Sequence, residues 1–209
     1  MRILILGASG ATGREVVRQA LAQELDVTAF VRDPARLTVD GPTLRVVQGD
    51  VGDYAAVSGA VEGQEAVIST LGVSRPLHSD PVVIEGVRHV LRAMQDHSVR
   101  RLVYLSFIGV HDSRAAAGPM IRYVAKFPLR HEIADHEAKE ALIRRSHCDW
   151  TIVRAPKLSN RHATGRYRDG EDIVARGFFP VLPRADVADF LLRQLRERTY
   201  VCKAPRVLP

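Results

Sequence analysis

A glycine-rich segment near the start of the chain has the residue types and spacing of a phosphate cradle. The sequence Gly7-Ala-Ser-Gly10-Ala-Thr-Gly13 directly follows an apolar run at residues 3–6 and directly precedes a helical pattern. A strand, loop and helix in this order are typical of a dinucleotide site. Gly7 permits a tight exit from the strand, Gly10 lets the backbone approach the pyrophosphate, and Gly13 lets the helix pack closely on the sheet.

The helix that follows this loop supplies the anion-binding groups. Its free N–H groups and the positive end of its dipole face the phosphates, and the hydroxyl groups of Ser9 and Thr12 add donors. A tight turn that binds nothing is the alternative, but it leaves the entropic cost of the glycines unexplained. The spacing lacks the Gly-Lys-Ser/Thr ending of a P-loop, which argues against ATP hydrolysis. The predicted phosphate-binding residues are Gly7, Ser9, Gly10, Ala11, Thr12 and Gly13.

The end of the second apolar run bears on the choice between NADP and NAD. Residues 27–31 are followed by a charged turn from Arg32 to Arg36. An acid at this point usually holds the ribose of NAD, whereas an arginine fork pairs with the 2′-phosphate of NADP. Arg32 comes first and Arg36 can fold back, so we predict NADP(H) as the cofactor. Asp33 fits an NAD ribose or a cap on the turn, and Arg32 also fits a solvated loop charge.

Residues at the ends of three further runs extend the predicted cofactor groove. After the run at 44–47, Asp50 fits the adenine amino group or, equally well, the N-cap of the next helix, while Val51 fits the adenine ring. Small residues after the run at 66–69 let the backbone pass beside the cofactor, and the nicotinamide is expected after the run at 102–105. The predicted groove residues at these ends are Asp50, Val51, Thr70, Leu71, Gly72, Ser106 and Phe107.

These residues meet only if the apolar runs form one parallel sheet. The five runs above and a sixth at 151–153 are nearly continuous in Val, Ile and Leu, as in strands covered on both faces. Helical stripes alternate with them at 16–21, 83–94 and 138–142. The pattern predicts an α/β fold, a Rossmann-type, doubly wound and mostly parallel sheet. Irregular segments predict substrate loops at 73–80, 108–130 and 157–183.

Composition is that of one globular domain. The chain has 209 residues, of which 46% are hydrophobic and 26% charged, so we expect a single domain over residues 1–209. The net charge of +6 comes from dispersed Lys and Arg, so we expect no nucleic-acid partner. The first apolar run is too short for a membrane span and lacks a secretory pattern, so we expect a cytoplasmic protein without a membrane partner.

The cysteines and histidines match no metal pattern. Cys148 and Cys202 have no CxxC spacing, which agrees with a reducing compartment and predicts neither a disulfide framework nor a zinc site. The histidine spacings also match no common zinc motif, so we expect no metal. The histidines considered are His78, His111, His131, His136, His147 and His162.

Taken together, these motifs resemble the atypical short-chain dehydrogenase/reductase superfamily, in its NAD(P)H-binding, NmrA-like branch. The resemblance spans nearly the whole chain. Within this branch, the chain is most similar to the small NADPH-dependent flavin reductases, also called biliverdin-IXβ reductases. It implies a Rossmann fold, as a monomer or weak homodimer, that reduces flavins, linear tetrapyrroles or similar acceptors with NADPH. The matching stretches are residues 7–13, 30–37, 47–51, 66–72, 101–110, 140–158 and 182–195.

The resemblance also implies catalytic residues. Ser106 matches the family's serine near the nicotinamide, and His136 matches its helix histidine. Lys157 stands where the reductase has a histidine after two prolines; it can anchor an acidic substrate but is a worse proton donor at neutral pH. Ordinary members of the superfamily use a Tyr-x-x-x-Lys pair. Tyr123 and Lys126 are one residue too close for that pair, and they fit either a catalytic pair on one helix face or a packed aromatic beside a solvated lysine.

The predicted chemistry is NADPH-dependent hydride transfer to a flavin, quinone or other conjugated small molecule, including tetrapyrrole-like acceptors. Such acceptors need position and a dry cleft more than they need catalytic side chains. Carbonyl reduction would require a better acid near the oxygen. A non-enzymatic NADP(H)-sensing regulator and an NADP-retaining isomerase or epimerase are the alternatives.

Overall fold

A computed structural model describes residues 1–72, 81–124 and 129–209. The predicted loop at 73–80, which includes His78, lies outside the described residues, as does Lys126 of the Tyr123 and Lys126 pair. Among the described residues, no helix combines the length and the apolar character that crossing a membrane requires.

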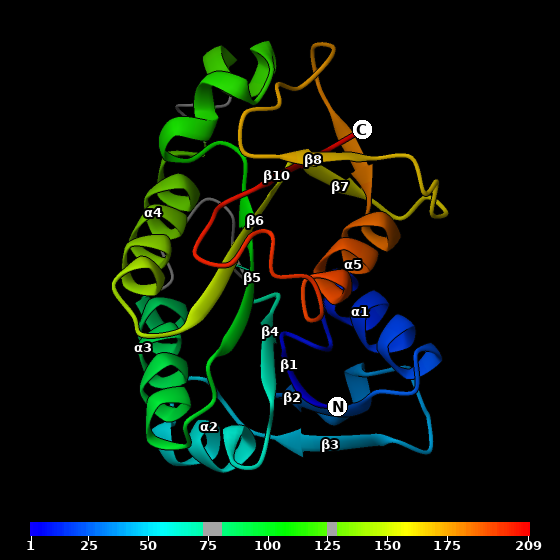
Figure 1. Ribbon diagram of the computed structural model, residues 1–209, viewed down its shortest axis with the longest axis vertical. Helices are drawn as coiled ribbons and strands as arrows, with labels where there is room; N and C mark the ends of the chain where they lie inside the picture. Colours follow the sequence, from blue (N-terminus) through cyan, green and yellow to red (C-terminus); the bar gives the residue numbers. More distant parts are fainter. Residues whose placement is uncertain (73–80, 125–128) are drawn as a thin grey trace.

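The centre of the molecule is a sheet with the strand order β3-β2-β1-β4-β5-β6-β10-β8 (Figure 1). Neighbouring strands from β3 to β10 are parallel, and β8 pairs antiparallel with β10 at one edge. The order reverses between β1 and β4, so the crevice for a ligand opens there, beyond the carboxyl ends of these strands. The bounds are β1 Arg2–Leu6, β2 Asp26–Val31, β3 Leu44–Gln48, β4 Ala66–Ser69, β5 Arg101–Phe107, β6 Asp149–Ala155, β8 Arg168–Gly170 and β10 Arg206–Leu208.

Helices cover both faces of this sheet. Helices α1 (Ala11–Ala22) and α5 (Arg184–Arg193) lie together on one face, and α2 (Tyr54–Val61), α3 (Pro81–Asp96) and α4 (Arg130–Arg144) lie on the other (Figure 1). Strand β1 shows why its run is continuously apolar. Alternate side chains pack into the two separate hydrophobic clusters, so all of Ile3, Leu4, Ile5 and Leu6 are buried. The Rossmann-type, mostly parallel sheet predicted from the sequence is therefore confirmed.

The C-terminal third contains regular structure that the sequence pattern did not predict. Strands β7 (Lys157–Ser159) and β9 (Val181–Pro183) form a small parallel sheet, and β8 also lies in the segment at 157–183. The prediction that this whole segment is a loop is therefore wrong. The strands were missed because three residues are too few to show the alternation of apolar and polar residues that marks a strand. The described part of 108–130 contains a 3-10 helix at His111–Ala116 and a π-helical turn at Met120–Val124.

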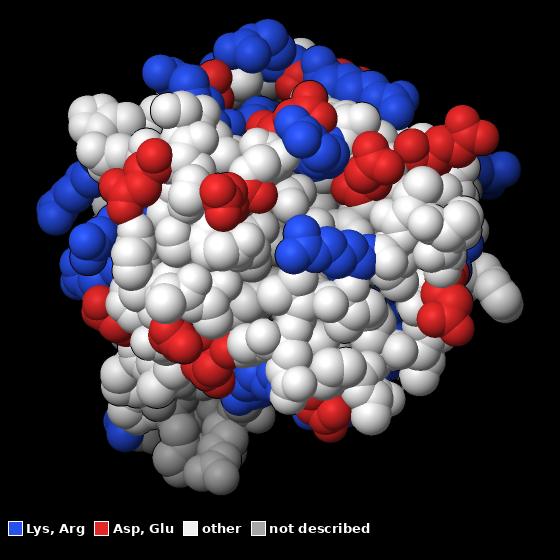
Figure 2. Space-filling view, turned by 90° about the horizontal axis from the view of Figure 1, so that it is seen from below, with Lys and Arg blue, Asp and Glu red and all other residues white. Residues whose placement is uncertain are grey.

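The molecular surface mixes charges of both signs. On the face shown in Figure 2, Asp and Glu side chains lie beside Lys and Arg side chains, and uncharged residues occupy much of the centre. The net charge of +6 is therefore not gathered into one basic patch on the described part of this face.

Candidate functional site

The glycine loop has the close backbone packing of a phosphate cradle. Gly7 adopts a φ of +74°, a conformation that favours glycine. A Cβ atom on Gly13 would lie 2.1 Å from the carbonyl oxygen of Gly7, so only glycine lets α1 start so near β1. Gly10 is the N-cap of α1 and provides no side-chain cap. The first N–H groups of α1 therefore remain available to an anion, and the loop fits a dinucleotide pyrophosphate.

A groove of about 770 Å³ extends from this loop across the ends of β2, β3 and β4. It brings together most of the residues predicted for the cofactor, from segments that are far apart in the sequence. Ser106 and Phe107 do not line this groove. The predicted residues that line it are Gly7, Ser9, Gly10, Ala11, Thr12, Gly13, Arg32, Arg36, Asp50, Val51, Thr70, Leu71 and Gly72.

Two aspartates that the sequence left ambiguous have distinct places. The carboxylate of Asp33 accepts a hydrogen bond of 3.0 Å from the Ala35 N–H and caps the short helix at Pro34–Arg36. Asp50 does not cap α2; Asp53 does, by accepting bonds from two N–H groups of the first turn. Asp50 instead accepts a bond of 2.8 Å from the Gly52 N–H within the loop, at the edge of the groove. The cap interpretation therefore holds for Asp33 and fails for Asp50.

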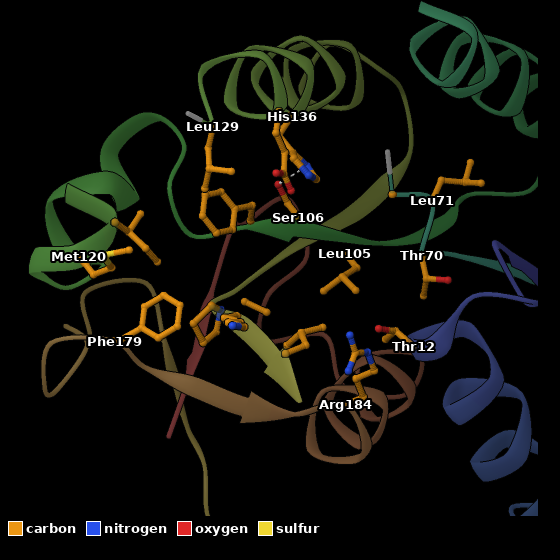
Figure 3. A pocket seen from close by; sticks show the side chains of 18 of the residues that line it. Thr12, Thr70, Leu71, Leu105, Ser106, Met120, Leu129, His136, Phe179 and Arg184 are labelled. Atoms are coloured by element: carbon orange, nitrogen blue, oxygen red, sulfur yellow. Dashed lines mark hydrogen bonds between the residues drawn. The ribbon is translucent and has the colours of Figure 1, made fainter. Parts of the chain in front are cut away.

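A second pocket, of about 720 Å³, continues from the groove (Figure 3). The two cavities share Thr12, Thr70, Leu71, Gly72 and Arg184. In Figure 3, Thr12 and Arg184 lie at one side of the pocket, and Met120 and Phe179 lie at the other. Ser106 and Phe107, which were predicted for the cofactor groove, line this pocket instead. Apolar side chains supply most of the remaining wall: Leu105, Ile121, Val124, Leu129, Ala155, Pro156 and Leu158.

Ser106 and His136, which the family resemblance gives as catalytic residues, are adjacent in this pocket. His136 points from α4 towards Ser106 (Figure 3), and its Nδ1 atom lies 3.4 Å from Ser106 Oγ. Burial, with a smaller effect from Lys139, lowers the pKa of His136 to about 3. The imidazole is therefore neutral at physiological pH and cannot act as a positively charged acid.

A buried ion pair that the sequence analysis missed lies behind Ser106. The Ser106 hydroxyl donates to Glu140 Oε1 at 2.7 Å, and Arg154 donates to both carboxylate oxygens of Glu140, at 3.2 and 2.7 Å. The exposed fractions of the Glu140 and Arg154 side chains are 0% and 1%. Burial acts to lower the pKa of Arg154, but the hydrogen bonds and charges of Glu140 and Asp112 raise it. The pair therefore fixes the direction of the Ser106 hydroxyl.

Two other predicted candidates lie away from the buried end of the pocket. Lys157 is exposed, and its Nζ atom lies 5.0 Å from the centre of the Phe179 ring, where it lines the pocket from β7. The side chain of Tyr123 is 68% exposed, does not line the pocket, and lies against Arg122. Tyr123 is thus neither packed nor placed at the pocket.

Arg184 is a site residue that the sequence analysis missed. It is the first residue of α5, and its Nη1 atom donates to the side-chain oxygen of Asn160 at 2.6 Å. Burial lowers the pKa of Arg184, which lines both cavities. Its place near the start of the matching stretch at 182–195 could have marked Arg184 as a candidate. Only the fold, however, brings the start of α5 beside Thr12 (Figure 3).

Comparisons with known proteins agree with this geometry. The chain is similar to the (4-alkanoyl-5-oxo-2,5-dihydrofuran-3-yl)methyl phosphate reductase of Streptomyces griseus, with 36% identity over 152 residues, which cover 73% of this chain and 46% of the relative. The chain spans less than half the length of the first curated relatives that it matches.

Solved structures share the fold over nearly the whole chain. The anaerobillin reductase ChuY of Escherichia coli O157:H7 superposes with a TM-score of 0.82 and 22% identity, covering 99% of this chain and 96% of that one. A short-chain dehydrogenase/reductase of Veillonella parvula, in complex with NADP, gives a TM-score of 0.78 and 18% identity, covering 99% and 93%.

A family model described as NAD(P)H-binding matches residues 7–198, which begin at the first glycine of the phosphate loop and end just after α5. The match covers most of the chain, including the groove and the second pocket. The chain therefore belongs to the NAD(P)H-binding family.

Proposed function

We propose that the chain is an NADPH-dependent reductase that delivers a hydride to a conjugated small-molecule acceptor, such as a flavin or a quinone. The observation that carries this proposal is the junction of the two cavities at Thr12, Thr70, Leu71, Gly72 and Arg184. A cofactor in the groove and an acceptor in the pocket would meet there, and such positioning provides much of the rate of a bimolecular step.

The chain's own residues would bind and orient the two reactants. The glycine loop and the first turn of α1 would hold the pyrophosphate, and the walls at Asp50 and Val51 would hold the adenine. When bound, NADPH supplies a hydride and leaves as NADP⁺. The apolar wall of the second pocket would exclude water from the junction, which protects a transferred hydride from side reactions.

A preference for NADPH over NADH rests on the tip of β2. Arg32 and Arg36 line the groove from this turn and would face a 2′-phosphate. The carboxylate of Asp33, which would repel that phosphate, is bonded to the Ala35 N–H instead. The positive charges of Arg32 and Arg36 therefore favour the cofactor that carries the 2′-phosphate.

The second pocket favours a mainly apolar acceptor that carries an acidic group. Its wall is mainly apolar, and Lys157 and Arg184 place cations on it. Similar proteins support reductase chemistry, since the Streptomyces relative and the Escherichia coli neighbour are both named reductases.

The test is the oxidation of NADPH and NADH, followed by absorbance, with FMN, riboflavin, menadione and biliverdin as acceptors. We expect acceptor-dependent oxidation that is faster with NADPH. Tight NADPH binding without turnover of any acceptor would contradict the proposal and favour the NADP(H)-sensing regulator. Product formation without net loss of NADPH would favour the isomerase or epimerase.

A further inference from the structure

The proposed reaction consumes a proton as well as a hydride. An acceptor that takes a hydride gains one hydrogen nucleus and two electrons, and the negative charge collects on its carbonyl oxygen or ring nitrogen. A positioned acid that protonates this atom accelerates such a step. The residues expected near the reaction from the family resemblance are Ser106, His136 and Lys157, so each is a candidate for the acid.

Ser106 is poorly arranged to give up a proton. Its hydroxyl hydrogen points to Glu140 Oε1 at 2.7 Å, and Glu140 is held in place by Arg154 at 2.7 and 3.2 Å. The hydroxyl therefore turns its lone pairs, and not its hydrogen, towards other partners. Ser106 suits the role of a hydrogen-bond acceptor in the pocket.

His136 and Lys157 are weak acids in this setting. The pKa of His136 is lowered to about 3, by burial and by Lys139, so the ring carries no positive charge at neutral pH. A neutral imidazole gives up its remaining proton with difficulty. A lysine ammonium is also a far weaker acid than a carboxylic acid, and Lys157 lies exposed beside Phe179.

We propose that Glu132 is the proton donor of this pocket, an inference that rests on the proposed reductase function. Glu132 lies in the first turn of α4 and lines the pocket together with Ser106 and His136. It precedes His136 by four residues, so both side chains project from one face of the helix. That face forms a wall of the pocket above Ser106 (Figure 3). Among the described residues that line the pocket, Glu132 is the one carboxylic acid.

The burial of Glu132 favours its protonated form. Burial raises the pKa of this carboxyl group above its ordinary value; the charge of Lys139 acts against this effect, and that of Asp135 acts with it. From the other walls of the pocket, Lys157 on β7 and Arg184 on α5 contribute positive charge, which acts in the same direction as Lys139 and favours the carboxylate. A raised pKa increases the fraction of a carboxyl group that holds its proton at a given pH, which suits a proton donor.

In the proposed step, the acceptor receives a hydride from NADPH and a proton from Glu132. As the acceptor takes the hydride from NADPH, the O–H bond of Glu132 breaks and its proton forms a new O–H or N–H bond on the acceptor. The electron pair of the broken bond stays on the Glu132 carboxylate. The carboxylate then takes a proton from water, which restores the acid before the next turnover.

The test compares the wild-type protein with Glu132→Gln, Glu132→Asp and a matched control, Glu137→Gln. Glu137 lies on the same helix but outside the pocket wall, where it pairs with Arg114 at 3.1 Å.

We expect the wild-type rate with the best acceptor of the panel to fall as pH rises through the pKa of Glu132. Glu132→Gln should lower kcat about 100-fold and remove this limb of the pH profile. It should leave the Kd for NADPH unchanged. Glu132→Asp should restore part of the rate, and Glu137→Gln should behave as the wild type.

A second readout does not depend on turnover. Carbon-13 NMR of the glutamate carboxyl groups, with the Glu132 signal identified by its loss in Glu132→Gln, should show that this group titrates above an ordinary glutamate. Titration at or below the ordinary value would overturn the proposal. So would a wild-type protein that turns over an acceptor while Glu132→Gln keeps the same rate and pH profile. If the wild type turns over none of the acceptors, the reductase function itself fails, and the proton donor fails with it.

Discussion

At the scale of single residues, the cofactor preference rests on how one turn distributes its charges. An acid directly after an arginine at the tip of β2 fits two opposite predictions, because a carboxylate suits an NAD ribose and also caps a turn. The bond between Asp33 and the Ala35 N–H shows the second use. Arg32 and Arg36 are then the charged side chains of this turn that line the groove.

Arg32→Glu should weaken NADPH binding far more than NADH binding. The change replaces a charge-assisted hydrogen bond to the 2′-phosphate with repulsion, and a bond of this kind contributes about 1.5–3 kcal/mol. We therefore expect the Kd for NADPH to rise about 10-fold to 100-fold, measured by calorimetry, with little change for NADH. Arg45→Glu, an exposed change on β3 outside the groove, is the control. Equal losses for both cofactors would contradict the assigned role.

Sequence reasoning found the residues of the groove but not those behind Ser106. The groove residues follow strands directly, so their positions derive from the order of the apolar runs. Glu140 is 34 residues from Ser106, and Arg154 is 14 residues further on, inside a buried strand. A charge within an apolar run gives no sign of its partner, because pairing depends on which helix covers that strand.

At the scale of elements, Gly13 and Gly10 of the loop between β1 and α1 differ in how closely the backbone surrounds them. Gly13 is in close contact with backbone, since a Cβ atom there would lie 2.1 Å from the Gly7 oxygen. Gly10 has a φ of −73°, which any residue adopts, and its Cβ would lie 3.1 Å from that same oxygen. The fold therefore requires glycine at position 13, whereas glycine at position 10 suits the proposed close approach of a dinucleotide.

The two substitutions Gly13→Ala and Gly10→Val should separate folding from binding. Gly13→Ala should lower the free energy of unfolding by about 3 kcal/mol, because the backbone it meets cannot move away without displacing α1. Gly10→Val should lower it by only about 1 kcal/mol, as valine is a poor N-cap, yet should abolish NADPH binding. Urea denaturation and calorimetry measure the two effects. Unchanged NADPH affinity in Gly10→Val would mean that the loop is only structural.

Helix α4 depends on the ion pair that it forms with β6. Glu140→Gln should lower the free energy of unfolding by about 3–5 kcal/mol, because it leaves the Arg154 guanidinium in the interior without its buried counter-ion. The control is Glu137→Gln on the same helix, whose pair with Arg114 is one-third exposed on both sides and should contribute about 0–1 kcal/mol. Equal losses in the two variants, measured by urea denaturation, would exclude a special role for the buried pair.

At the scale of the whole molecule, the sheet could be predicted because it is covered twice. The two hydrophobic clusters take up side chains from both faces of the central strands, so these strands are mostly apolar, and the described bounds match the predicted runs to within about two residues at each end. The edge is different. Strands β8 and β10 have three residues each and owe their pairing to tertiary contacts, so no periodic pattern marks them.

The buried His136 should also make the stability of the whole domain depend on pH. Its pKa is about 3 in the folded chain, while a histidine in the unfolded chain titrates near ~6.5. The unfolded state therefore binds more protons between these values, so this contribution is complete above pH ~6.5 and is lost as pH falls towards 3. The slope it adds to the free energy of unfolding is at most about 1.4 kcal/mol per pH unit.

Chemical denaturation from pH 7 to 4 measures this effect. The free energy of unfolding should decline less steeply in His136→Gln than in the wild type, whereas His131→Gln, an exposed change on the same helix, should follow the wild type. Parallel curves for all three proteins would show that His136 is protonated without cost and would contradict its burial as a neutral ring.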